Sequence, residues 1–306
     1  MENQQSIPQE QEHKLSFGRW YQKHYKHLLI LPAILLLFSI IYLAQFTAKT
    51  GDIIYKDISL TGGTTITVFD KTTNIEEIKL TLIAQFPDLS IRKITDIQTG
   101  EQKAFLLESK TEAELLKSAL ESELGYELNG ENSSIEFSGE SLSTGFYKQL
   151  RTALLIAFVL MAIVVFIIFR TVIPSGAVIL SAFADIIMTL AVINFFGFQL
   201  STAGIIALLM LIGYSVDTDI LLTSRLLKST EGTSSQRLVS AFKTGMTMTL
   251  TSIAAIAAGL FIIYPISDTL RQMFTIILIG LGFDMFNTWI TNASILKWYM
   301  EAKHKQ

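Results

Sequence analysis

The sequence predicts a polytopic α-helical membrane protein with six transmembrane helices and one α+β domain outside the membrane. Half of its 306 residues are apolar and only 17% are charged, a composition typical of membrane proteins. Six stretches are apolar over the roughly 20 residues needed to cross a bilayer. The segment 47–148, which lies between the first two stretches, is instead acidic, with 17 acidic and 10 basic residues.

This composition excludes several classes of protein. The chain is too apolar to be disordered, and its net charge of -3 does not suit a basic nucleic-acid binder. It contains no cysteine. A disulfide-stapled secreted domain, a thiolate nucleophile and a cysteine-based metal site are therefore excluded.

The spans follow one another in a simple order. A tail at 1–27 precedes the first span at 28–46, which is too long for the apolar part of a cleaved signal peptide and is expected to stay as an anchor. The other five spans form one bundle within 149–296, and 297–306 is a second tail. They are predicted at 152–169, at 172–216 (two spans divided by the turn at 196–199), at 247–264 and at 273–296.

Basic residues predict the orientation, because positively charged segments stay on the cytoplasmic side. With six spans, the two tails and the links between spans two and three and between spans four and five lie on the same side. These four segments carry Lys14, Arg19, Lys23, Lys26, Arg170, Arg225, Lys228, Arg237, Lys243, Lys297, Lys303 and Lys305. We therefore expect a multi-pass protein of the cell membrane with both termini cytoplasmic and 47–148 on the outer side.

The residue pattern of the outer segment predicts a ferredoxin-like domain with the element order β-α-β-β-α-β. Its expected elements are a strand at 64–69, a helix at 75–86, strands at 89–97 and 103–107, a helix at 111–125 and a strand at 134–137. Such a fold hosts many functions. Two interpretations remain open, a folded spacer and a head that moves or contacts a substrate.

The outer segment shows no sign of catalysis or of cofactor binding. It has no histidine, no cluster of metal ligands, no P-loop and no plausible Ser-His-Asp set. Gly62 and Gly63 precede its first strand and are expected to form a tight backbone turn rather than a phosphate site. We expect no enzymatic activity, no cofactor and no metal.

Four carboxylates lie at or near membrane depth, where an ionisable side chain costs roughly 3 kcal/mol. They are Asp185, Asp217, Asp219 and Asp284. No Lys, Arg or His lies at the centre of any span, and the nearest candidate cation is Lys243, just before the fifth span. Such carboxylates either form hydrogen bonds between helices or carry protons along a polar path.

Asp217 and Asp219 are two residues apart, which places them about 200° apart around a helix. They cannot share one face, so at most one points directly at a given pathway. Gly213 lies four residues before Asp217 on the same face, where a neighbouring backbone can approach closely. Asp217 is the position that we favour most.

Four segments resemble the SecF branch of the SecD/SecF family, within the RND superfamily of transporters. They are D-I-S-L-T-G-G-T at 57–64, S-T-A-G-I-I-A at 201–207 followed by I-G-Y-S-V-D at 212–217, A-D-I-I-M-T-L-A-V at 184–192, and F-K-T-G-M-T at 242–247. The resemblance covers nearly the whole chain after residue 20. Asp219, Asp284 and the N-T-W-I-T-N run at 287–292 resemble the archaeal type.

The resemblance implies an auxiliary subunit that acts with SecD beside the SecY channel and promotes protein export, coupled to the proton-motive force. Its implied partners are SecD, SecY, exported unfolded polypeptides and membrane lipids, and no nucleic acid. The implied proton-coupling candidates are Asp217, Asp219, Asp185, Asp284 and Lys243. The chain departs from the bacterial pattern, which has His at Ala184, Arg at Lys243 and Asn at Asp217. The alternatives are an RND-like exporter of lipids or small molecules and a scaffold for SecD that binds no protons.

Overall fold

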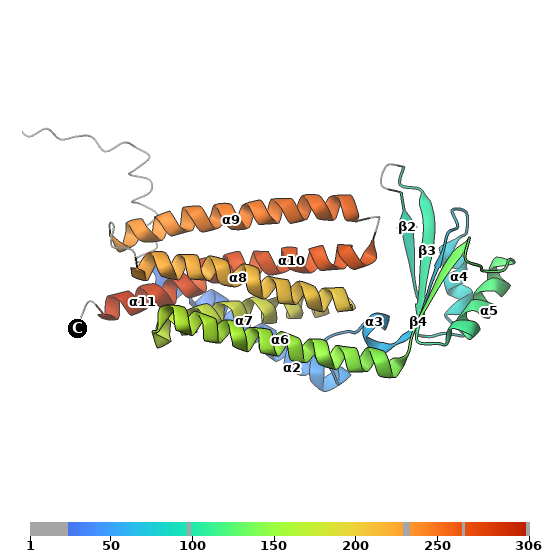
Figure 1. The fold of residues 1–306 in the computed structure, drawn as a ribbon, viewed down its shortest axis with the longest axis horizontal. Coiled ribbons are helices and arrows are strands. Elements are labelled where there is room, and N and C mark those ends of the chain that lie inside the picture. The colour runs from blue at the N-terminus through green and yellow to red at the C-terminus, as the bar shows by residue number, and fades with distance from the viewer. Residues whose placement is uncertain (1–23, 97–98, 229–232, 265–266, 304–306) are drawn as a thin grey trace, which may run out of the picture.

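The computed structural model describes residues 24–96, 99–228, 233–264 and 267–303. Within these ranges, six helices are long and apolar enough to cross a membrane. They form one elongated bundle, and a small β-sheet domain projects from one end of it (Figure 1). The prediction of a six-span α-helical membrane protein with an added α+β domain is confirmed.

The helices of the bundle run almost its full length. They are α2 (Ile30–Thr50), α6 (Glu140–Phe169), α7 (Val172–Phe195), α8 (Thr202–Lys228), α9 (Ser234–Ile263) and α10 (Asp268–Phe286), which continues through the π-helix η1 (Asn287–Asn292) into α11 (Ala293–Lys303). The second helix begins 12 residues before the apolar run that predicted it, because α6 continues past the apolar stretch to the sheet domain. The sixth span is one helical rod of three parts.

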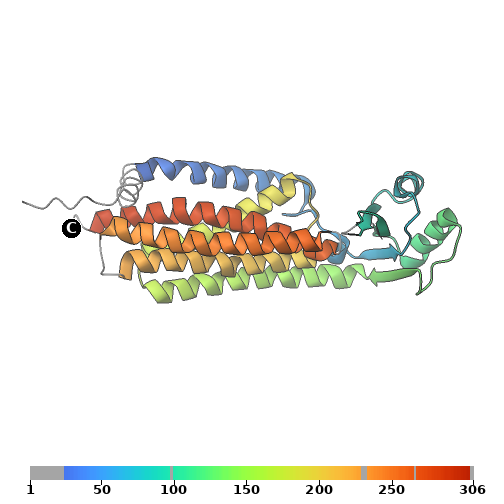
Figure 2. The ribbon, with the colours of Figure 1, turned by 90° about the horizontal axis from the view of Figure 1, so that it is seen from above.

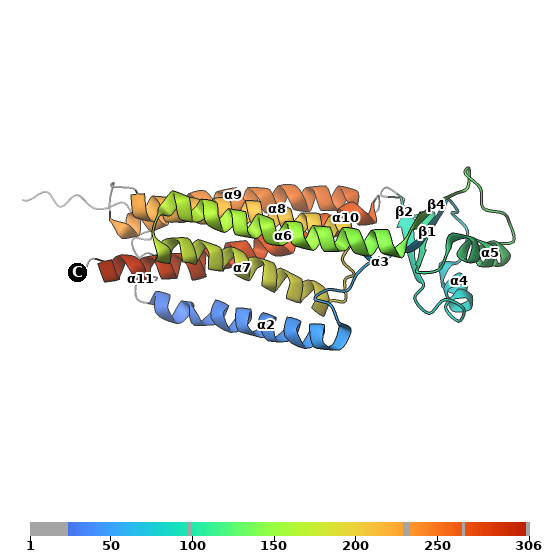
Figure 3. The same ribbon diagram turned by 60° about the horizontal axis from the view of Figure 1, so that its bottom comes forward.

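α8 lies in the middle of the bundle and packs against α6, α7, α9 and α10, while α2 packs against α7 (Figures 2 and 3). Leu208, Leu211 and Ile277 are buried between α8 and α10. By contrast, only 6% of the apolar window of α9 and 11% of that of α6 are buried within the chain. Most residues of these two helices are thus at least partly exposed on the outside of the bundle.

The outer domain contains β1 (Gly63–Val68), α4 (Ile75–Leu82), β2 (Ser90–Thr95), β3 (Gln102–Ser109), α5 (Ala113–Leu124) and β4 (Ser133–Ser138). Its element order is thus β-α-β-β-α-β. The strands form one sheet in the order β2-β3-β1-β4, and all neighbouring strands are antiparallel. α4 and α5 lie on the face away from the bundle (Figure 1), where Ile66, Phe105 and Leu107 of the sheet are fully buried with Leu116 and Leu120 of α5.

A short helix, α3 (Ile58–Thr61), and a two-glycine turn connect the bundle to the sheet. Gly62 has φ +85° and Gly63 has φ +142°, values that side-chain-bearing residues rarely adopt. A Cβ atom on Gly62 would lie 2.5 Å from the Cα of Glu140, and one on Gly63 would lie 2.4 Å from the carbonyl oxygen of Ser109. The turn therefore needs glycine at both positions, because Gly62 lies against the start of α6 and Gly63 against the end of β3.

The two ends of the bundle differ in what they carry. The start of α2, the α6–α7 link, the end of α8, the start of α9 and the end of α11 all lie at the end away from the sheet (Figure 1). The α7–α8 loop and the start of α10 lie at the end next to the sheet. The described basic residues of the links, such as Arg170, Arg225 and Arg237, thus gather at the end opposite the domain.

Candidate functional site

Three carboxylates meet inside the bundle. Asp185 of α7, Asp219 of α8 and Asp284 of α10 are each 0% exposed. Their helices pack pairwise against one another, and this packing brings together residues that lie up to 99 positions apart. We refer to these three residues as the carboxylate cluster.

Polar side chains from α8 and η1 bind the cluster. Asp185 accepts hydrogen bonds from the Ser215 hydroxyl at 2.6 Å and from the Asn287 amide at 2.7 Å. Asp219 accepts from the Asn292 amide at 2.7 Å and from the Thr288 hydroxyl at 2.9 Å.

The Thr288 hydroxyl links two of the three carboxylates. Its oxygen lies 2.9 Å from Oδ1 of Asp219 and 3.2 Å from Oδ1 of Asp284. A hydroxyl has a single hydrogen to donate, so it can satisfy only one of these two oxygens fully at a time. A change in the charge of either carboxylate therefore changes the hydrogen bond of the other.

The π-helix places both asparagines on the same side. In a π-helix residues five apart lie one turn apart, whereas in an α-helix they are roughly 140° apart. Asn287 and Asn292 are five residues apart and reach Asp185 and Asp219 respectively. The Thr291 hydroxyl donates to Oδ1 of Asn287 at 3.2 Å, which orients the amide so that its NH₂ group faces Asp185.

Several acceptors in the cluster have no hydrogen-bond donor among the described residues. They are Oδ2 of Asp219, Oδ2 of Asp284 and Oδ1 of Asn292. In the same part of the chain, no Lys, Arg or His forms an ion pair with Asp185, Asp219 or Asp284. A buried carboxylate without a cation is costly, and a proton on a free oxygen removes that cost. Oδ2 of Asp219 and Oδ2 of Asp284 are therefore the atoms of the cluster at which a proton would displace no existing hydrogen bond.

The other predicted site residues lie outside the cluster. Asp217 is exposed on the face of α8 that turns away from Asp219, as the spacing of two residues requires, and Lys243 is exposed on α9. Within the described ranges neither side chain forms a hydrogen bond or an ion pair. Gly213 is also exposed, with open space where a side chain would lie. The structure thus brings together Asp185, Asp219 and Asp284, and leaves Asp217, Lys243 and Gly213 on the bundle surface.

Sequence reasoning did not assign the residues that bind the cluster. Ser215, Asn287, Thr288 and Asn292 are all buried, and none was predicted as a site residue. A signal was present, because the N-T-W-I-T-N run places four amide or hydroxyl side chains in an otherwise apolar helix. Their partners could not be identified without the packing of α10 and η1 against α7 and α8.

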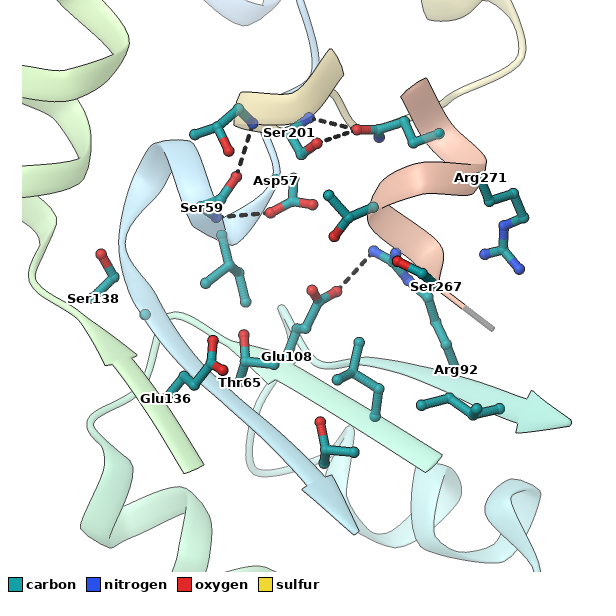
Figure 4. A pocket seen from close by; sticks show the side chains of 18 of the residues that line it. Asp57, Ser59, Thr65, Arg92, Glu108, Glu136, Ser138, Ser201, Ser267 and Arg271 are labelled. Atoms are coloured by element: carbon teal, nitrogen blue, oxygen red, sulfur yellow. Dashed lines mark hydrogen bonds and ion pairs between the residues drawn. The ribbon is translucent and has the colours of Figure 1, made fainter. Parts of the chain in front are cut away.

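A second feature lies between the open face of the sheet and the bundle. Here a cavity of about 760 Å³ is lined by sheet residues such as Thr65, Arg92 and Glu136 and by bundle residues such as Ser201 and Arg271 (Figure 4). Arg92 of β2 forms an ion pair with Glu108 of β3 at 2.7 Å across its wall. No group of three or more His, Asp or Glu in the described ranges is arranged to hold a metal ion.

Comparison with known proteins gives one consistent result. The family model described as "Protein export membrane protein SecD/SecF, C-terminal" matches residues 120–302. The protein-export membrane protein SecF of Methanolacinia petrolearia is 39% identical over 92% of this chain and 95% of its own length. The SecF proteins of Methanocaldococcus jannaschii and Pyrococcus furiosus are 37% and 34% identical, each over 91% of this chain and over 96% and 92% of their own lengths.

Two solved structures share the fold. The crystal structure of SecDF, a translocon-associated membrane protein from Thermus thermophilus, aligns with a TM-score of 0.68 at 18% identity. It covers 92% of this chain and 38% of the SecDF chain. The super-membrane-facing form of SecDF aligns with a TM-score of 0.61 at 19% identity, covering 93% of this chain and 39% of its own. The present chain thus spans about two fifths of each of these SecDF chains.

Proposed function

The chain belongs to the SecD/SecF family of protein-export membrane proteins, and from this premise we propose that it is an auxiliary subunit of the Sec export machinery. In this role it acts with SecD beside the SecY channel and promotes the passage of unfolded polypeptides across the cell membrane. The proton-motive force drives this action. The protein itself cleaves and modifies nothing.

The carboxylate cluster is the observation that supports proton coupling. Three carboxylates from three helices are fully buried, share donors and have two oxygens with no donor among the described residues. Membrane proteins keep such groups where a proton or substrate passes. In this proposal Asp219 and Asp284 exchange protons, Thr288 connects them, and Asp185 is the third carrier.

The surface around Asp217 supports an interaction with SecD. Asp217 and Gly213 lie on an exposed face of α8, and Lys243 is exposed on the neighbouring helix α9. An acidic side chain that faces lipid at depth costs roughly 3 kcal/mol, so this face favours a partner helix that supplies a donor. The open space at Gly213 lets that helix approach closely. We assign Asp217 and Lys243 to the SecD contact.

The test of the proposed function replaces Asp219 by asparagine. Asp219→Asn keeps the size of the side chain and removes its ability to carry a proton. We expect the variant to remain in the membrane and to co-purify with SecD, and to lose the part of protein export that depends on the proton gradient. Export is measured in cells and in energised vesicles.

Asp217→Asn is the matched control, because the same change is made two residues away and outside the cluster. It is expected to weaken co-purification with SecD, while the export that it still supports continues to depend on the proton gradient. Normal export by Asp219→Asn, even when combined with Asp284→Asn, would leave only the scaffold role. Failure of the wild-type protein to associate with SecD would favour an exporter of lipids or small molecules.

A further inference from the structure

The segment that leads from the bundle into the outer domain is held to the bundle by hydrogen bonds as well as by its covalent connections. Three parts of the chain meet where the sheet domain reaches the bundle. They are the segment 53–59, which leads from α2 to α3, the loop 199–202 between α7 and α8, and Gln272 in the second turn of α10. We call this set of contacts the outer joint, and Figure 4 shows the part of it around Ser59 and Ser201.

The first part of the outer joint is a backbone connection. The N–H of Leu200 donates to the carbonyl of Tyr55 at 2.6 Å, and the N–H of Asp57 donates to the carbonyl of Leu200 at 3.1 Å. Lys56 and Leu200 thereby form an isolated parallel β-bridge. Because the bonds join backbone to backbone, the loop and the segment that leads into the domain move as one piece.

Two side chains extend this connection to the helices on either side of the loop. The Ser59 hydroxyl accepts a hydrogen bond from the N–H of Thr202, the first residue of α8, at 3.1 Å. The Asn194 amide, near the end of α7, donates to the carbonyl of Ile53 at 2.6 Å. Both ends of the loop are therefore tied to the chain that carries the outer domain.

Gln272 ties α10 to the same loop with its whole amide group. Its Oε1 atom accepts from the N–H of Ser201 at 3.0 Å and from the Ser201 hydroxyl. Its Nε2 atom donates to the carbonyl of Gln199. Since donor and acceptor both bind the loop, a displacement of α10 must either carry the loop with it or break several hydrogen bonds at once.

The helices that meet in the outer joint are those that carry the carboxylate cluster. α8 connects Thr202 at the joint to Asp219, α10 connects Gln272 to Asp284, and α7 connects Asn194 to Asp185. At about 1.5 Å per residue, roughly 25 Å of α8 separates the joint from the cluster. A helix transmits a shift over this length because its backbone hydrogen bonds make it stiff.

We propose that the outer joint transmits a change at the carboxylate cluster to the outer domain, and that Gln272 is the positioning residue that couples α10 to this movement. The proposal rests on the proton coupling proposed above and adds the route by which it acts. A shift between α8 and α10 at the cluster appears at Gln272 and Ser201. It then passes through Leu200 and Ser59 to the domain and changes the cavity beneath the sheet.

The test uses the full chain together with SecD in sealed vesicles. The protein is oriented so that its outer domain faces the solution to which the reagent is added. The chain has no cysteine, so a single Thr67→Cys change places one thiol in the wall of the cavity. The rate at which an impermeant maleimide reacts with this thiol is measured with and without an imposed proton gradient. We expect the rate to depend on the gradient when the joint is intact.

Gln272→Ala is expected to abolish this dependence although the cluster is intact, and Gln272→Glu, which lacks the donor to Gln199, to reduce it. Ser59→Ala removes a different contact of the joint and is expected to weaken the dependence even if Gln272→Ala proves unstable. Thr275→Val is the matched control, since that hydroxyl bonds within α10 to the carbonyl of Arg271. The control should respond as the wild type does.

The possible results distinguish transmission through the outer joint from proton coupling at the carboxylate cluster. If Asp219→Asn abolishes the gradient dependence while Gln272→Ala and Ser59→Ala keep it, the joint proposal is wrong and proton coupling stands. If the thiol reacts at the same rate with and without the gradient in the wild type, movement of the domain is excluded. The loss of gradient-dependent export in Asp219→Asn then remains the separate test of proton coupling.

Discussion

Asp70 follows β1 and accepts several hydrogen bonds in the outer domain. The Thr73 hydroxyl donates to it at 2.6 Å, the N–H of Thr72 at 2.7 Å and the Tyr126 hydroxyl at 2.8 Å. Burial alone raises the pKa of Asp70, but these hydrogen bonds outweigh it and hold that pKa well below its ordinary value. Burial, and then the bond to Asp70, raises the pKa of Tyr126 to about 12.

These contacts predict a pH dependence for the domain. A lowered folded-state pKa stabilises the fold above the unfolded pKa of about 3.9, and this contribution is lost as the pH falls through the folded pKa. We expect Asp70→Asn to lower the melting temperature of the domain at neutral pH, and the gap to the wild type to close at acidic pH. Calorimetry of both proteins from neutral to acidic pH measures this difference in melting temperature. Tyr126→Phe should show a smaller difference in melting temperature from the wild type. For Asp70→Asn, a difference that does not change with pH would contradict the stabilising role of the Asp70 carboxylate.

At the scale of single residues, the sequence indicated that Asp217 and Asp219 face different sides of their helix, but not which of them faces the interior of the bundle. The spacing of two residues correctly implied that only one could face a given pathway. It could not show which, because that depends on the rotation of α8 against α7 and α10. We favoured Asp217, which shares a helix face with Gly213, whereas the structure buries Asp219. Asp185 and Asp284 could be located at membrane depth from the apolar runs around them.

At the scale of elements, η1 is the feature most open to test. A π-helix holds one extra residue relative to an α-helix, so deletion of Ala293, which directly follows η1, should let the segment close as α-helix while α11 keeps its orientation. Asn287 and Asn292 would then point in different directions, and one of the bonds to Asp185 and Asp219 would be lost. We expect this deletion to reduce gradient-dependent export in the same assay as Asp219→Asn.

The control for this deletion is Ala293→Gly, which removes the side chain at that position but keeps the number of residues in the helix. It is expected to export as the wild type does when membrane levels are matched. Equal export by the deletion and the control would show that the π-helical geometry is not needed at the cluster. A loss in both variants would point to the packing of the buried Ala293 side chain instead.

The elements themselves were largely predictable, whereas their ends were not. Each apolar run predicted a helix, because spanning a bilayer requires one. The start of α6 at Glu140 was missed because that part of the helix is polar and stands outside the apolar run. The π-helix was also missed, since hydropathy is the same for an α-helix and a π-helix.

At the scale of the whole molecule, the sequence predicted the helical bundle and the outer domain, but not the contacts of the outer joint between them. The acidic segment between apolar runs was enough to identify a separate domain. The outer joint depends on pairs such as Gln272 with Ser201, which are 71 residues apart. Neither residue differs from an ordinary polar residue at a helix end, so only the fold shows that they meet. The joint also turns the open face of the sheet toward the bundle.

The orientation of the molecule can be tested with the same cysteine-free chain. The described basic links lie at the end of the bundle away from the sheet, and such segments stay cytoplasmic. A cysteine at Lys93, exposed on β2, should therefore lie outside the cell, and one at Ala302, exposed near the end of α11, should lie inside. We expect an impermeant maleimide to label Lys93→Cys in intact cells, and to label Ala302→Cys only after the membrane is permeabilised. The reverse pattern would place the outer domain in the cytoplasm, where it could not contact a polypeptide that emerges on the far side of the membrane.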